Sequence, residues 1–162
     1  MPTYVSYGVA DVGVSGLDTL LEDDFDLLEP LDLALGRCRL TVAAPAARAH
    51  AGIGGPFVKV ATKYPRLTRA FYRRRGVEPV VVTLSGSVEL AAVAGLAERV
   101  VDLVDTGATL RANGLVEVET VVEVTSRLVV NPASMKTRHA AVDRFVRRLE
   151  AALLSSPPEV TA

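Results

Sequence analysis

Hydrophobic positions along the chain fall into short runs that alternate with segments of helical spacing. Runs rich in Val, Leu and Ala predict strands at residues 11–16, 27–35, 38–44, 58–61, 80–84 and 100–104. The segments between them predict helices at 18–23, 65–75, 88–94 and 108–112. A further helix is expected to begin at Pro2 and to end between residues 5 and 10. Strands spaced by helices predict an α/β fold with largely parallel strand pairing.

The C-terminal third continues this pattern with longer segments. Residues 115–130 form one β-rich stretch, which a break near Thr125 and Ser126 would divide in two. Residues 133–154 predict one amphipathic helix. The residues of its apolar stripe are Val142, Phe145, Val146, Leu149 and Leu153. A surface loop is expected at residues 45–56 and a frayed tail at 155–162, because both are rich in turn-forming residues.

Composition excludes several classes of protein. The chain has 162 residues with 49% hydrophobic and 23% charged side chains, which fits a globular domain or two small lobes. With a net charge of −1, the chain lacks the excess of basic residues that is typical of nucleic-acid-binding proteins. No apolar run reaches the length of a bilayer span, and the first fifteen residues contain no Lys or Arg. We therefore expect a soluble, cytoplasmic protein with no nucleic-acid or membrane partner.

The few sulfur and imidazole groups predict no metal site. Cys38 is the only cysteine, so an intrachain disulfide is impossible, and we expect a small buried apolar residue there. His50 and His139 lie far apart in the sequence without a cysteine partner, which excludes a structural zinc site.

The segment from residue 101 to 114 carries the most informative chemistry. A strand delivers Asp102 and Asp105, and the turn from Thr106 to Thr109 then opens a short helix. Free N–H groups and the helix dipole at such a turn favour an anion, and Gly107 permits close backbone approach. The threonine hydroxyls can donate to phosphate oxygens, while the carboxylates suit sugar hydroxyls. These groups together predict a ribose 5-phosphate site.

The alternative interpretation is purely structural. Asp105 or Thr106 would cap the helix, and Asn113-Gly114 would end it. A second turn, Ser85–Ser87 followed by Glu89, allows the same two interpretations.

A third strand end adds polar groups. Lys63 and Tyr64 follow the strand predicted at 58–61. Ligands of open α/β sheets collect at the carboxyl ends of strands, so we expect these three ends to share one crevice.

Residues 7–18, 58–65, 84–89 and 102–115 together resemble the motifs of the catalytic subunit of ATP phosphoribosyltransferase, in the same order. The resemblance runs from Pro2 to about Lys136. It implies a bilobal fold like that of type II periplasmic binding proteins, with the substrate cleft between the lobes. Lobe I would comprise residues 1–37 and 127–162, and lobe II residues 38–126.

The resemblance also implies a reaction: N1 of the adenine of ATP attacks the anomeric carbon of phosphoribosyl pyrophosphate and expels pyrophosphate, which carries Mg²⁺. Glu89 and Asp102 would bind the ribose hydroxyls. The turn Asp105, Thr106, Gly107, Ala108 and Thr109 would hold the ribose and its 5-phosphate. Gly16 and Asp18 would lie near the adenine nucleotide. No residue is expected to act as a covalent nucleophile or base, and no protein metal site is expected.

The two ends of the chain raise further expectations. The family begins with a strand–loop–helix unit bearing a Pro-Lys-Gly-Arg-like motif, which this sequence lacks, so lobe I is expected to be incomplete. Met1 would then correspond to an internal valine codon, GUG, that was read as the start codon. The chain also ends before the ACT-like regulatory domain of long-form relatives. It is thus similar to the short form, which implies a homo-oligomer with a regulatory subunit resembling histidyl-tRNA synthetase.

Three rival interpretations stand beside this enzyme. The chain could be a non-catalytic binding module of the same fold that holds a phosphorylated ligand, or an inactive truncated form. A type I phosphoribosyltransferase also places paired acids before a Thr-Gly turn. That fold expects more hydrophobic residues before the acids and a flexible hood, and the other motifs do not fit it.

Overall fold

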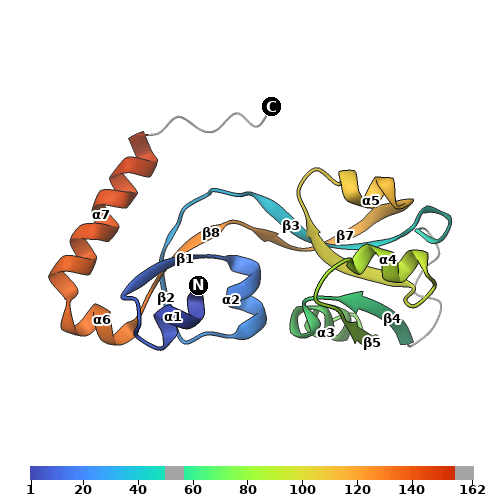
Figure 1. Cartoon of the computed structure of the whole chain (residues 1–162), viewed down its shortest axis with the longest axis horizontal. Helices are drawn as coiled ribbons and strands as arrows, with labels where there is room; N and C mark the ends of the chain where they lie inside the picture. Colours follow the sequence, from blue (N-terminus) through green and yellow to red (C-terminus); the bar gives the residue numbers. More distant parts are fainter. Residues whose placement is uncertain (50–56, 156–162) are drawn as a thin grey trace. The chain divides into compact units, whose positions relative to one another are not determined.

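The computed structural model describes residues 1–49 and 57–155, which form two compact units (Figure 1). Unit 1 combines residues 1–36 with 125–162, and unit 2 comprises residues 37–124. Most of the predicted loop at 45–56, with His50, and the tail beyond residue 155 lie outside the described residues.

Unit 2 is built on a five-stranded mixed sheet with the order β5-β4-β6-β3-β7. Its strands are β3 (Cys38–Pro45), β4 (Phe57–Thr62), β5 (Glu78–Thr83), β6 (Arg99–Val104) and β7 (Leu115–Val124). β4 pairs in parallel with β5 and β6, whereas β3 pairs antiparallel with β6 and β7.

The expectation of largely parallel pairing is therefore wrong. β4, β5 and β6 follow one another along the chain through helices, which supply the crossovers that parallel pairing needs. β3 and β7 stand at the two ends of the unit's sequence, and β3 runs antiparallel to both of its sheet neighbours, β6 and β7.

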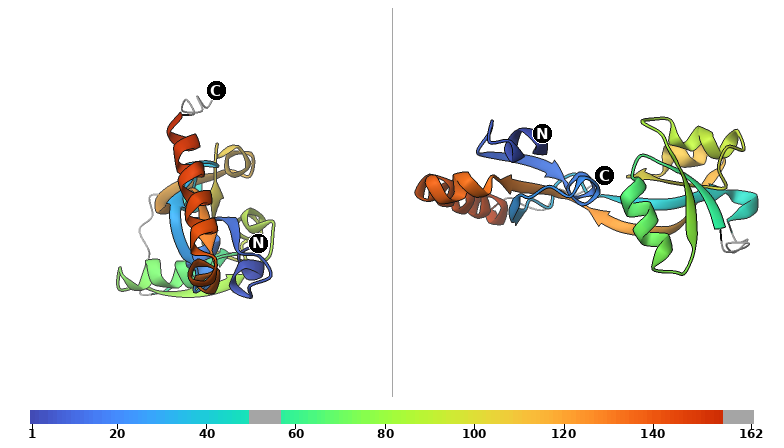
Figure 2. Two further views of the ribbon diagram at one scale, coloured as in Figure 1. Left: turned by 90° about the vertical axis from the view of Figure 1, so that its left-hand side faces the viewer. Right: turned by 90° about the horizontal axis from the view of Figure 1, so that it is seen from below.

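Helices cover both faces of this sheet (Figure 2). They are α3 (Pro65–Arg73), α4 (Val88–Val93) and α5 (Ala108–Ala112), and a short 3-10 helix η1 (Ala46–Arg48) follows β3. Phe71 and Tyr72 of α3 pack on Leu40 and Val101 on one face. α4 and α5 pack on the opposite face, against Val100 and other small side chains. Burial on both faces explains the near-continuous apolar runs of the central strands.

Unit 1 holds a smaller antiparallel sheet with the order β1-β8-β2. Its elements are α1 (Pro2–Ser6), β1 (Val12–Gly16), α2 (Leu17–Asp23), β2 (Leu28–Asp32), β8 (Ser126–Val130), α6 (Pro132–Thr137) and α7 (His139–Ser155). Val5, Leu20 and Val129 form its core. The β-rich stretch at 115–130 breaks at Thr125, so that β7 belongs to unit 2 and β8 to unit 1.

The two terminal helices compare differently with their predictions. The first ends at Ser6, within the predicted range, and Gly8 then adopts a left-handed conformation with φ +72°. The C-terminal helix is divided at Arg138, whose guanidinium forms an ion pair of 2.6 Å with Asp11. Tertiary contacts with the N-terminal segment thus end α6 where the spacing of apolar residues continues.

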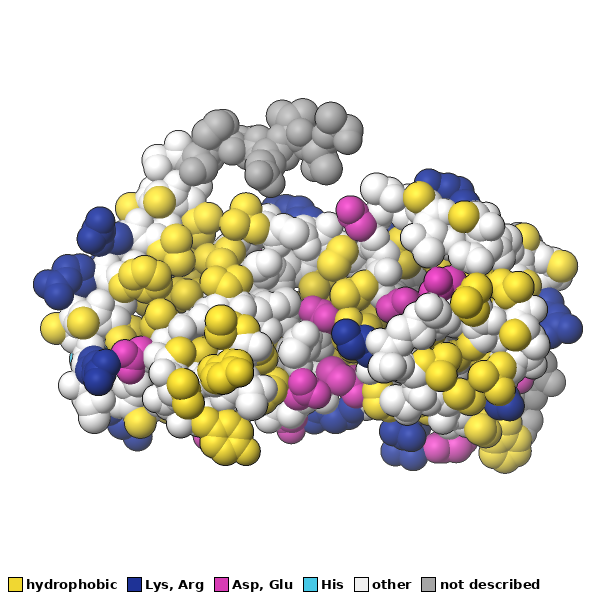
Figure 3. Space-filling view, in the orientation of Figure 1, with side chains coloured by type: hydrophobic (Ala, Val, Ile, Leu, Met, Phe, Trp, Pro, Cys, Tyr) yellow, Lys and Arg dark blue, Asp and Glu magenta, His cyan; other side chains and the backbone are white. Residues whose placement is uncertain are grey.

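Burial also differs from expectation at single positions. Cys38 is half-buried rather than buried. On the predicted stripe of α7 only Val142 is buried, and Phe145 is 47% exposed. Lys and Arg side chains line α6 and α7 along the left-hand edge of Figure 3.

Asn131 joins the two ends of unit 1. Its side-chain oxygen accepts hydrogen bonds from the N–H groups of Ala133 and Ser134 at 2.8 and 3.0 Å, which caps α6. Its amide nitrogen donates to the carbonyl oxygens of Val5 and Ser6 at 2.7 and 3.3 Å.

Asn131→Ala removes the cap, and the buried N–H of Ser134 loses its acceptor. We expect it to lower the free energy of unfolding in urea by about 2 kcal/mol. Thr137→Ala, on the exposed side of the same helix, serves as the control and should change it by no more than about 0.5 kcal/mol. Equal effects of the two substitutions would contradict this role for Asn131.

Candidate functional site

A cavity of about 280 Å³ opens at the carboxyl end of β6, within unit 2. It is lined by Glu89 of α4, by Val100, Asp102, Leu103 and Val104 of β6, by the turn Asp105–Gly107, and by Ala108, Thr109 and Leu110 of α5. Parallel strands commonly present ligand sites at this end, and β6 is paired in parallel with β4.

Most of the residues predicted for the site lie on this one cavity. They are Glu89, Asp102, Asp105, Thr106, Gly107, Ala108 and Thr109. Gly16 and Asp18 do not line it, since they lie in unit 1 at the start of α2. The buried carboxylate of Asp18 occupies the space that a side chain on Gly16 would need.

Backbone N–H groups of the turn before α5 are available as hydrogen-bond donors. Gly107 adopts φ +73°, a conformation that glycine reaches without strain. Among the described residues, no turn or side-chain hydrogen bond uses the N–H of Thr106, Gly107 or Thr109. Since α5 has only five residues, the anion preference of this turn rests on these N–H groups more than on a helix dipole.

The capping alternative finds little support at this turn. Gly107 is the N-cap residue, and α5 has no side-chain cap. The Thr106 hydroxyl accepts a long hydrogen bond of 3.4 Å from the N–H of Ala108. The predicted end of the helix is confirmed, because Gly114 is left-handed at φ +67° and Asn113 donates to the carbonyl of Thr109.

Carboxylates form the other part of the cavity wall. Burial raises the pKa of Asp102, and the carboxylate of Glu89 raises it further. A hydrogen bond of 2.9 Å from the N–H of Leu103 and the charge of Lys63 act in the opposite direction. Glu89 and Lys63 therefore both act on the charge of Asp102, and the two acids suit a ligand with neighbouring hydroxyl groups.

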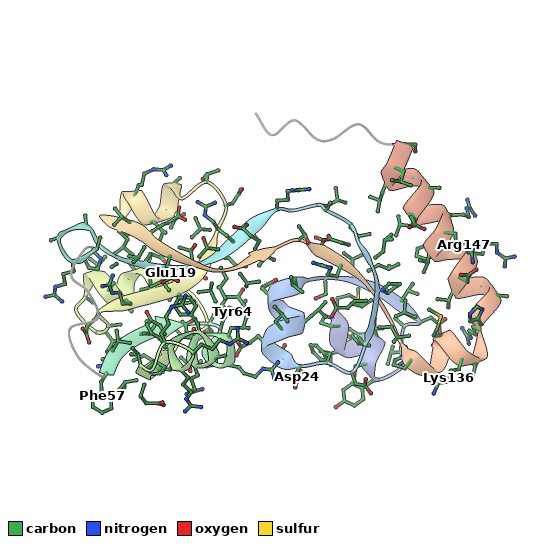
Figure 4. The ribbon with its side chains drawn as sticks, turned by 180° about the vertical axis from the view of Figure 1, so that it is seen from behind. Asp24, Phe57, Tyr64, Glu119, Lys136 and Arg147 are labelled. Atoms are coloured by element: carbon green, nitrogen blue, oxygen red, sulfur yellow. The ribbon has the colours of Figure 1, made fainter. Side chains whose placement is uncertain are left out.

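The other predicted strand ends contribute less. Tyr64 lies just beyond the end of β4, which begins at Phe57 (Figure 4). Its side chain is buried in the core beside α3, not on the cavity. Ser87 begins α4 in a left-handed conformation without a side-chain cap, so the Ser-Gly-Ser turn places only Glu89 on the cavity.

The sequence analysis did not identify three charged side chains next to the turn before α5. Arg39 of β3 forms a two-pronged ion pair with Glu117 of β7, and Arg111 of α5 contacts the turn itself. Arg39 and Glu117 are 78 residues apart, and no local pattern marks them as partners.

Within residues 1–49 and 57–155, no three His, Cys, Asp or Glu side chains converge to hold a metal ion. No helix in these ranges is long and apolar enough to cross a membrane.

Known proteins share this structure to different extents. A solved ATP phosphoribosyl transferase (HisG:HisZ) complex from Thermotoga maritima matches with a TM-score of 0.85 and 35% identity, over 96% of this chain and 76% of that one. An ABC transporter/periplasmic binding protein from Brucella ovis matches with a TM-score of 0.52 and 12% identity, over 81% of this chain and 46% of that one. The second match shows the fold alone, and confirms an α/β fold like that of periplasmic binding proteins.

Sequence comparison agrees over nearly the whole chain. The ATP phosphoribosyltransferase of Syntrophotalea carbinolica is 55% identical over 155 residues, which cover 94% of this chain and 71% of that relative. The family model for ATP phosphoribosyltransferase matches residues 1–151. The chain therefore belongs to the ATP phosphoribosyltransferase family.

Proposed function

We propose that this chain transfers the phosphoribosyl group of phosphoribosyl pyrophosphate to N1 of ATP. The products are phosphoribosyl-ATP and pyrophosphate, and the reaction is the first step of histidine biosynthesis. Family membership supports this reaction. The observation that carries it is one cavity that joins a turn of free N–H groups to a pair of carboxylates.

The 5-phosphate is assigned to the turn from Asp105 to Thr109. The N–H groups of Thr106, Gly107 and Thr109 can each donate to a phosphate oxygen, and the two threonine hydroxyls add further donors. Hydrogen bonds to an ionised acceptor are stronger than neutral ones. The turn thus offers several charge-assisted donors to one dianionic group.

The ribose is assigned to the acidic wall. Asp102 and Glu89 accept hydrogen bonds from its neighbouring hydroxyl groups, and both carboxylates line the cavity. Their negative charge repels phosphate, which favours the orientation that places the phosphate at the turn.

The chemical step requires positioning more than a reactive side chain. Adenine N1 is a weak nucleophile, and holding it in line with the anomeric carbon can lower the barrier by roughly 7–11 kcal/mol. Mg²⁺ enters as part of the pyrophosphate substrate, since it binds substrate phosphates with only one or two protein carboxylates. Gly16 and Asp18 are assigned to the adenine nucleotide. No side chain is assigned as a nucleophile or base.

The protein is further proposed to work as a homo-oligomer with a regulatory subunit that resembles histidyl-tRNA synthetase. The solved HisG:HisZ complex of the Thermotoga maritima relative supports such a partner. Both substrates are cytoplasmic metabolites, so the cytoplasm is the proposed compartment.

The direct test is pyrophosphate release from phosphoribosyl pyrophosphate, measured with and without ATP and with and without the regulatory subunit. We expect release that requires both ATP and magnesium. Binding of ribose 5-phosphate without any ATP-dependent release would favour the non-catalytic binding module instead.

Thr109→Val tests the phosphate assignment with almost no change in shape. Losing one hydroxyl donor to a dianion should raise the KM for phosphoribosyl pyrophosphate roughly tenfold, or about 1.5 kcal/mol. The KM for ATP should stay within about twofold, because a lost hydrogen bond acts on the ligand it contacted. Thr83→Val, at the exposed end of β5, is the matched control; equal changes in both KM values would refute the assignment.

Asp102→Asn tests the acidic wall through its pH dependence. Because the native pKa of Asp102 lies above its ordinary value of 3.8, this carboxyl group favours the folded state at low pH. That contribution is lost as pH rises through the native pKa. Asp102→Asn should therefore raise the free energy of unfolding at pH 7 while weakening phosphoribosyl pyrophosphate binding.

The stability gain of Asp102→Asn should shrink as pH falls toward 3.8, which urea unfolding at several pH values measures. Asp143→Asn, which removes an exposed ion pair with Arg147, is the control. It should change stability by less than about 1 kcal/mol. A variant of Asp102 that is less stable than the unchanged chain at pH 7 would contradict the prediction.

A further inference from the structure

Arg39, Glu117 and Arg111 form a charged cluster behind the β6–α5 turn, which we call the rear cluster. Nε and Nη2 of Arg39 donate to the two carboxylate oxygens of Glu117 at 2.7 and 2.6 Å. Nη1 of Arg39 donates to the carbonyl oxygen of Asp105 at 3.1 Å, and Nη1 of Arg111 donates to that of Thr106 at 3.0 Å. Two successive carbonyl groups of the turn are thus held by two guanidinium groups.

Holding these carbonyls also orients the N–H groups of the turn. In a trans peptide the C=O and N–H point in opposite directions, and the described residues contain no cis peptide. The carbonyl of Asp105 shares its peptide plane with the N–H of Thr106, and the carbonyl of Thr106 shares its plane with the N–H of Gly107. Both N–H groups must therefore point away from the arginines.

The rear cluster contacts the turn but not the cavity. None of its three side chains lines the cavity, although the turn that they hold does. A Cβ atom on Gly107 would stand 3.0 Å from Nη1 of Arg111 and 3.1 Å from Oε1 of Glu117. Only one layer of backbone therefore separates the rear cluster from the cavity.

Opposite charges stabilise the rear cluster. The hydrogen bond and charge of Arg39, together with the charge of Arg111, lower the pKa of Glu117 and keep it ionised. Glu117 raises the pKa of Arg39 in return. The charges of Glu123 and Asp105 raise the pKa of Arg39 as well, so acidic side chains near this guanidinium keep it charged.

We propose that the rear cluster positions the turn for the 5-phosphate of phosphoribosyl pyrophosphate. Arg39 and Arg111 hold the carbonyls of Asp105 and Thr106 so that the N–H groups of Thr106 and Gly107 face the phosphate. Glu117 holds Arg39 in place. These are positioning residues that do not touch the ligand, and this role rests on the proposed function.

The test measures binding by calorimetry on the full chain with three probes: phosphoribosyl pyrophosphate, ribose 5-phosphate and inorganic pyrophosphate. Arg39→Gln should weaken the first two tenfold or more and leave pyrophosphate within twofold. Arg39→Lys retains the charge but not the two-pronged geometry, so it should recover only part of the affinity. In turnover, the KM for phosphoribosyl pyrophosphate should rise while that for ATP stays constant.

Arg73→Gln is the matched control, because Arg73 also pairs through two nitrogens with a glutamate, Glu78, in the same unit. It should bind all probes like the unchanged chain. Arg111→Gln removes a single contact from an exposed side chain and should weaken the two ribose phosphates at least threefold. It keeps the test decisive if Arg39→Gln does not fold.

The outcomes separate this inference from the proposed function. An unchanged chain that binds neither ribose phosphate overturns the proposed function, and this inference with it. If the unchanged chain binds both ribose phosphates and the Arg39→Gln and Arg111→Gln variants bind them equally well, only the role of the rear cluster is overturned. If Arg39→Lys binds the two ribose phosphates with full affinity, the charge at residue 39 is sufficient for binding. That result would also refute the positioning role.

Discussion

A trans peptide cannot turn its carbonyl without turning its N–H, and this constraint couples the two sides of the β6–α5 turn. The guanidinium groups of Arg39 and Arg111 donate hydrogen bonds to the carbonyl oxygens on one side. The N–H groups are left for the cavity on the other. The antiparallel register of the sheet makes this arrangement feasible, because Arg39 of β3 pairs with Val104, the last residue of β6 before the turn. A strand that contributes nothing to the cavity wall thereby shapes it.

Charge is divided across the same turn. The cavity side carries Asp102, Glu89 and Asp105, and the rear side carries Arg39 and Arg111 with Glu117. Such a division suits a ligand with hydroxyl groups at one end and a phosphate at the other. It also carries a cost, since burial and the neighbouring Glu89 disfavour the ionised form of Asp102. A group that binds the proposed ribose thus reduces the stability of the fold that holds it.

The framework around the turn is not specific to this chemistry. The fold is shared at 12% identity with a periplasmic binding protein, so backbone architecture alone says little about the reaction. The parallel strands β4 and β6 bring their carboxyl ends to one edge of the sheet. What distinguishes this chain there is the placement of acids, threonines and glycine on β6 and the turn after it. The proposed function therefore depends on a few residues placed on a fold that other proteins share.

Local spacing in the sequence was sufficient to predict α5 at residues 108–112 and to single out Asp102 to Thr109, because a strand, a turn and a helix start involve neighbouring residues. The order of the motifs likewise sufficed to identify the family, since it needs no knowledge of packing. Long-range pairing was not accessible in this way. The mixed sheet, the break of the C-terminal helix at Arg138 and the burial of Tyr64 depend on contacts between distant segments. The pairing of Arg39 with Glu117 across 78 residues is set by strand register, and a periodic pattern of apolar residues contains no information about which strands become neighbours.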